Sequence, residues 1–160
     1  MPSDRPRSSV AFAGLVALGL IGCSRETDGE ARPPLVPAEG RATVEGAPAI
    51  GARVMLHPTD PELVGLGLFP HGTVDDSGAF VLSTYEQADG APAGRYRVTV
   101  TWPDLDYRPR SPLEREELAL GGSPPDRLRG RYADPDLSGL ELTIEGDGSS
   151  PQALPPIELP

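Results

Sequence analysis

The chain lacks lysine altogether and holds one cysteine, and each of these shortages excludes a class of protein. Its 160 residues contain 24 acidic residues against 14 basic ones, all arginine, for a formal net charge of −10. Such an acidic chain is a poor partner for nucleic acid or for an anionic lipid surface. A single cysteine excludes an internal disulfide. With 19 glycines and 20 prolines, the composition also excludes a large core and a helical bundle, and favours a small, loop-rich domain.

The N-terminal segment has the pattern of an export signal. Arg5 and Arg7 form a short basic region, and Val10–Leu20 is an uninterrupted apolar run of 11 residues. A membrane-spanning helix needs about 20 residues, so the run is too short for an uncleaved anchor. Its length fits the apolar region of a secretory signal peptide.

Leu20-Ile21-Gly22-Cys23 follows and resembles the lipobox of bacterial lipoproteins. The resemblance implies a signal peptide over residues 1–22, cleavage before Cys23, and a diacylglycerol on its thiol that anchors the protein in the membrane. By the rule of that family, Ser24 rather than Asp after the cysteine favours the outer membrane. The alternative is a buried cysteine in an ordinary N-terminal helix, which the polar residues 24–29 disfavour.

Residues 23–37 are polar and stiffened by Pro33-Pro34, which predicts a flexible tether after the lipidated cysteine.

Residues 38–160 alternate short β-type runs with Gly, Pro and Asp turns, the pattern of an all-β sandwich or barrel. Seven strands are predicted, at residues 40–44, 52–57, 66–74, 79–85, 95–102, 140–145 and 154–159. The run 75–78 predicts the turn of a β-hairpin. In the long connection 104–130, Ser111-Pro112-Leu113-Glu114 predicts a capping box and one short helix outside the sandwich.

Three stretches are similar to carboxypeptidase-regulatory-like domains. They are Glu39–Val54 with its segments Gly-Arg-Ala-Thr-Val and Gly-Ala-Arg-Val, Gly72–Phe80 with its Asp-Asp-Ser-Gly turn, and Gly90–Val100 with its Gly-Arg-Tyr-Arg-Val segment. Residues 129–140 also resemble a closing motif of short lipoproteins from planctomycete-like bacteria. The resemblance implies a seven-stranded Greek-key β-sandwich of the transthyretin (prealbumin) type.

No complete catalytic or metal-binding set is recognisable. The chain has no Gly-x-Ser-x-Gly elbow, no phosphate-binding glycine loop and no His/Cys cluster. The enzyme branches of the transthyretin-like fold require a Tyr-Arg-Gly-Ser ending or two closely spaced histidines, whereas His57 and His71 are 14 positions apart. Three aspartate pairs are candidate calcium ligands without the spacing of a calcium loop, so no metal and no cofactor is predicted. These pairs are Asp75 with Asp76, Asp104 with Asp106, and Asp134 with Asp136.

We therefore expect a lipid-anchored, non-enzymatic envelope protein that binds an envelope protein or a glycan through the long connection. The candidate binding residues are Trp102, Asp104, Asp106 and Tyr107. Strand alternation predicts that Trp102 is buried at the end of the core. Two alternatives remain: a carbohydrate-binding module, which requires an exposed Trp102, and a hydrolase or metal-dependent enzyme that uses the Asp-rich loops.

Overall fold

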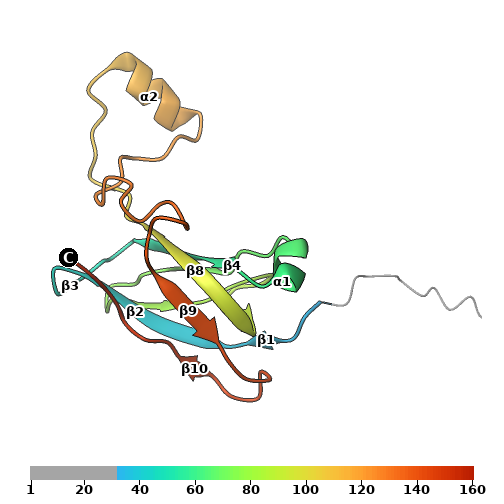
Figure 1. The fold of residues 1–160 in the computed structure, drawn as a ribbon. Helices are drawn as coiled ribbons and strands as arrows, with labels where there is room; N and C mark the ends of the chain where they lie inside the picture. The colour runs from blue at the N-terminus through green and yellow to red at the C-terminus, as the bar shows by residue number, and fades with distance from the viewer. Residues whose placement is uncertain (1–31) are drawn as a thin grey trace, which may run out of the picture. The chain divides into compact units, whose positions relative to one another are not determined.

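Strands make up most of the regular structure in the computed structural model, which describes residues 32–160 (Figure 1). In chain order they are β1 (Leu35–Val36), β2 (Ala38–Val44), β3 (Ala47–Pro48), β4 (Arg53–Pro58), β5 (His71–Thr73), β6 (Ala79–Val81), β7 (Ala91–Pro92), β8 (Gly94–Thr101), β9 (Glu141–Ile144), β10 (Gln152–Ala153) and β11 (Ile157–Leu159). The helices of this part are α1 (Pro61–Gly65) and α2 (Pro112–Ala119). The all-β class is confirmed, whereas the expected signal peptide 1–22, Cys23 and residues 24–31 of the expected tether lie outside the described residues.

Two sheets carry the fold. β5, β4, β8 and β9 lie side by side in that order, and each neighbouring pair is antiparallel. The second sheet is centred on β2, which pairs antiparallel with β3 and β6 and parallel with β10 and β11. Glu39 pairs with both Val81 of β6 and Ala153 of β10, so those two strands flank β2 on opposite sides. β1 and β7 form a further two-stranded ladder.

The sheets share one hydrophobic core, and the alternation expected from the sequence places their inward residues there. Val54 and Leu56 of β4 and Val98 and Val100 of β8 are fully buried. Tyr96 is buried with them, and its hydroxyl donates to a backbone carbonyl at 2.8 Å. Burial of each such side chain contributes roughly 1.5–3 kcal/mol, so these two central strands hold the layers together.

The segment 66–74 departs furthest from the expected strands. Only its end is extended, as β5, and the preceding residues 61–65 form α1, which the sequence pattern did not predict. Gly67 has a φ of +64°, a left-handed conformation that suits a turn after a helix. Phe69 remains 50% exposed. The apolar residues before β5 therefore belong to a surface turn rather than to a strand.

The folded part begins inside the segment expected to be a tether (23–37). Leu35 and Val36 pair with Pro92 and Ala91 as the β1–β7 ladder. Val36 is only 1% exposed and belongs to the core. Because this apolar residue is sequestered, the folded body starts at Leu35, three residues before the expected boundary at 38.

The turn expected after residue 74 is present, but it does not close a simple hairpin. The Asp75 carboxylate accepts the backbone N–H groups of Ser77 and Ala79 at 2.8 and 3.0 Å, and Gly78 has a φ of +82°. β5 pairs with β4 whereas β6 pairs with β2, with one bridge, His71 to Ser83, between the two arms. The turn therefore carries the chain from one sheet to the other.

The helix expected in the long connection is confirmed as α2. The Ser111 hydroxyl accepts the N–H of Glu114, and the Glu114 carboxylate accepts the N–H of Ser111, which completes the capping box. α2 stands clear of both sheets in Figure 1 and buries no residue. Within residues 32–160, neither helix has the length and apolar character needed to cross a membrane.

Candidate functional site at the base of the long loop

The long connection leaves and re-enters the body through two short segments that hydrogen-bond to each other. We call these segments, Trp102–Asp104 and Pro125–Arg127, the loop base. The N–H of Arg127 donates to the carbonyl of Trp102 at 2.8 Å, and the N–H of Asp104 donates to the carbonyl of Pro125 at 2.9 Å. Pro103 and Asp126 form a β-bridge between these bonds. The long connection is therefore closed at its base by an antiparallel β-bridge and two backbone hydrogen bonds, which fix the direction in which it leaves the sheet.

Asp126 supplies the strongest local restraint of the loop base. Its Oδ1 accepts the backbone N–H groups of Trp102 and Leu128 at 2.7 and 3.1 Å, and its Oδ2 accepts that of Gly130 at 2.8 Å. A carboxylate that accepts three N–H groups satisfies donors that the turning chain would otherwise leave unpaired. One side chain thus joins the end of β8 to the return of the loop.

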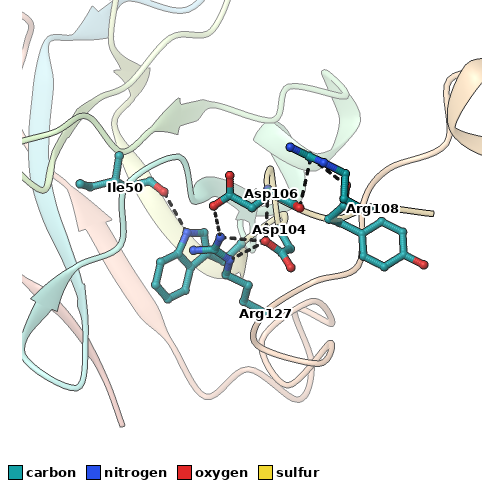
Figure 2. Close-up of polar contacts among 7 residues, drawn as sticks. Ile50, Asp104, Asp106, Arg108 and Arg127 are labelled. Carbon is teal, nitrogen blue, oxygen red and sulfur yellow. Dashed lines mark hydrogen bonds and ion pairs between the residues drawn. The ribbon is translucent and has the colours of Figure 1, made fainter. Parts of the chain in front are cut away.

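Trp102 is half-buried rather than fully buried, and it packs against the edge of the core. Its Nε1–H donates to the carbonyl of Ile50 at 2.8 Å (Figure 2). The guanidinium of Arg127 lies 5.1 Å from its ring centroid, within the range of a cation–π interaction. Both the polar atom and one side of the ring are therefore engaged by the protein itself.

Asp104 and Asp106, the other candidates at the start of the loop, both face Arg127 (Figure 2). Nη2 of Arg127 lies 2.8 Å from Oδ1 of Asp104 and 3.5 Å from Oδ2 of Asp106. The hydrogen bond from Arg127 holds the pKa of Asp104 below its usual value, and the Asp104 carboxylate raises the pKa of Arg127. Arg108 donates to the backbone carbonyls of Asp106 and Tyr107. The two carboxylates of Asp104 and Asp106 are thus both paired with the guanidinium of Arg127.

Tyr107 belongs to a neighbouring hollow beneath α2, which it lines with Glu114, Glu117 and Leu118. The Glu114 carboxylate beside its hydroxyl raises the pKa of Tyr107. The structure thus groups Trp102, Asp104 and Asp106 around Arg127, and places the Tyr107 side chain along the next stretch of the loop.

Three of the other aspartates that could have held calcium, Asp75, Asp134 and Asp136, make contacts within the protein. Asp75 holds the turn between the sheets, and Asp136 pairs with Arg97. Asp134 accepts the N–H of Asp136 at 2.8 Å. Nowhere in residues 32–160 do three His, Cys, Asp or Glu side chains gather in an arrangement that could hold a metal ion.

The two histidines lie near Phe69 on the outer side of the β4–β5 pair. The Nε2 atom of His57 lies 3.0 Å from the hydroxyl of Thr99, and burial lowers the pKa of His57. The Nδ1 atom of His71 lies 3.4 Å from the carbonyl of Phe69. The partner of one ring is a hydroxyl and that of the other is a backbone carbonyl, so within residues 32–160 neither ring is hydrogen-bonded to a carboxylate.

An open groove of about 460 Å³ lies beside the loop base. Its lining comes from the turn before β4, from β4, β5 and β8, and from both ends of the loop: Gly51, Arg53, Thr73, Thr101, Pro103, Leu105, Ser123, Pro124 and Asp126. The sequence pattern missed Arg53, Asp126 and Arg127 as site residues. Alternation along residues 52–57 places Arg53 on the outward face, but only the pairing of β4 with β5 and β8 shows what lies beside it. The sequence carries no signal for Asp126 and Arg127, since only the fold brings them back to Trp102.

No family model, no curated protein and no solved structure matches the chain. Any argument about function therefore rests on the groove, on the loop base and on the N-terminal sequence pattern. The first two belong to a packed β body with one long loop.

Proposed function

We propose that the protein is a lipid-anchored component of the cell envelope whose β body acts as a non-enzymatic binding module. In this proposal residues 1–22 are a lipoprotein signal peptide, and lipidated Cys23 attaches the protein to the membrane, with the outer membrane favoured. The body is proposed to be a Greek-key sandwich of the transthyretin-like, carboxypeptidase-regulatory-like type. Its partner is proposed to be another envelope component, with the loop base and the groove beside it as the contact surface.

The observation that carries the binding role is the construction of the loop base. Two backbone hydrogen bonds, three bonds to the Asp126 carboxylate and the Arg127–Asp104 pair fix the point at which the loop leaves the body. Rigid scaffolds that present elaborated loops commonly use them for recognition. The groove beside this base is consequently preformed, and a ligand would not have to order it.

The acidic residues of the loop support a binding role over an enzymatic one. A general acid or base works best with a pKa near the operating pH. The arginine next to Asp104 and the backbone N–H of Arg110 next to Glu114 instead lower the pKa of each carboxyl. Both stay ionised at neutral pH, which suits electrostatic positioning and not proton transfer.

A carbohydrate-binding module is the second candidate, favoured by the partial exposure of Trp102. A sugar that stacks on an indole needs a free ring face. Arg127 lies over the ring, and the indole N–H is bonded to Ile50. Stacking on that face would require Arg127 to leave its ion pair with Asp104, so we favour recognition through the groove.

Cell fractionation combined with partner capture tests the proposal. The full chain is compared with Cys23→Ala and with a variant in which residues 105–124 are replaced by a short Gly-Ser linker. A variant in the exposed helix α1, Glu62→Gln, is the matched control. We expect Cys23→Ala to leave the membrane fraction, and the loop replacement alone to lose cross-linked envelope partners. Membrane sedimentation that is indifferent to Cys23, or an unchanged set of partners without the loop, would contradict the proposal.

A further inference from the structure

The floor of the groove is a row of three side chains that can all donate hydrogen bonds. Arg53 of β4 pairs directly with Thr73 of β5 on one side and with Thr101 of β8 on the other. Directly paired residues have Cβ atoms about 4.5–5.5 Å apart on the same face of a sheet. Within residues 32–160, none of the three side chains makes a hydrogen bond or ion pair with the protein. A guanidinium flanked by two hydroxyls thus faces the open groove.

The walls of the groove are apolar and come from the loop. Pro103, Leu105 and Pro124 line it, and Leu105 is 69% exposed. Leu105 lies over Gly51, with its Cδ1 atom 3.6 Å from the position that a Cβ would take there. Such a large exposed aliphatic side chain beside a groove provides apolar contact area that residues 32–160 leave open to solvent.

Arg53 is the one charge of the groove that lacks a partner in the described chain. The other charged lining residue, Asp126, directs both carboxylate oxygens to backbone N–H groups of the loop base. The groove therefore combines one uncompensated positive charge, two hydroxyl donors and apolar walls. This combination complements a carboxylate that is attached to an apolar body.

The geometry points to this groove as a binding site for the C-terminal end of an extended peptide. This inference rests on the binding role proposed above and names the class of ligand. The planar guanidinium of Arg53 matches a carboxylate in a two-pronged hydrogen bond, and the threonines donate to the same group. The apolar side chains of the last residues contact Leu105 and the two prolines. A phosphate fits less well, because it carries up to two charges towards a chain whose net charge is −10.

Isothermal titration with a defined peptide tests the assignment. The full chain in detergent is titrated with acetyl-Ala-Ala-Leu as the free acid and as the C-terminal amide. Hydrogen bonds to a charged group are worth about 1.5–3 kcal/mol, so we expect the acid to bind at least about tenfold more tightly than the amide. Arg53→Gln should abolish that difference, and Thr101→Val should reduce affinity for the acid several-fold. Arg115→Gln, which changes an exposed arginine on α2, should bind like the parent.

The outcomes separate this assignment from the proposed binding role. Equal binding of acid and amide, no binding of either, or an undiminished preference in Arg53→Gln would overturn the assignment. Displacement of the peptide by an equal concentration of inorganic phosphate would identify a general anion site and overturn it too. If deletion of the loop still removes envelope partners in these cases, the binding role survives alone. Circular dichroism of each variant verifies that the body is folded.

Discussion

Replacement of Asp126 by alanine should destabilise the whole body, because one carboxylate closes the loop base. The change removes three hydrogen bonds, from the N–H groups of Trp102, Leu128 and Gly130. A hydrogen bond to a charged group contributes about 1.5–3 kcal/mol, and partial exposure of this half-buried site lowers that to about 1 kcal/mol for each bond, so the free energy of unfolding should fall by about 3 kcal/mol. Asp126→Asn should cost only about 1 kcal/mol, because its amide oxygen replaces Oδ1 while its NH₂ group cannot accept from Gly130.

Urea unfolding of the full chain carrying Cys23→Ala measures this effect. Trp102 is the only tryptophan, so its fluorescence reports on the loop base, and far-ultraviolet circular dichroism reports on the sheets. With a urea slope of about 1–3 kcal/mol per M, the midpoint should fall by about 1–3 M for Asp126→Ala. Asp106→Ala is the control on the same loop, since within residues 32–160 its ionic contact is the exposed one to Arg127. If Asp126→Ala shifted the midpoint no further than Asp106→Ala, the loop base would not be the restraint described here.

Three further changes probe other parts of the body. Gly40→Ala places a Cβ 2.5 Å from the Phe80 ring, so unfolding should become easier by about 1–3 kcal/mol in urea titrations, and adding Phe80→Leu should recover part of this loss. The hydrogen bond from the Ser77 hydroxyl, and then those from backbone N–H groups, hold the pKa of Asp75 below its ordinary value. The ionised carboxylate therefore stabilises the fold at neutral pH, and this contribution is lost as the pH falls through the lowered pKa. Asp75→Asn should show a smaller drop in urea midpoint between pH 7 and pH 3 than the parent. Ser111→Ala removes the cap of α2, which buries nothing, so amide exchange across residues 112–119 should accelerate while the urea midpoint stays unchanged.

Local patterns predicted those parts of the fold whose determinants are near in sequence. Alternation along β8 placed Tyr96, Val98 and Val100 inward, because a half-buried strand needs only a period of two. The capping box of α2 was equally visible, since its two bonds span three residues. The apolar turn before β5 misled the same reasoning, because hydrophobicity alone does not distinguish a strand from a half-exposed turn.

The candidate site was only partly predictable for a corresponding reason. The sequence identified Trp102, Asp104 and Asp106 as neighbours, yet their common partner Arg127 comes from more than 20 residues further on. The row formed by Arg53, Thr73 and Thr101 depends on the pairing of β4 with β5 and β8. Pairing registers between distant strands are not encoded in any short motif, so this site emerged only with the fold.

Intact-mass spectrometry of the protein extracted from its native envelope tests the proposed membrane attachment directly, because it measures the mass of the mature chain and of any lipid bound to it. We expect a chain that begins at Cys23 and carries the mass of a diacylglycerol, and we expect Cys23→Ala to yield no lipidated form. A full-length chain that begins at Met1, or a shortened chain without lipid on Cys23, would contradict the anchored module proposed for this protein.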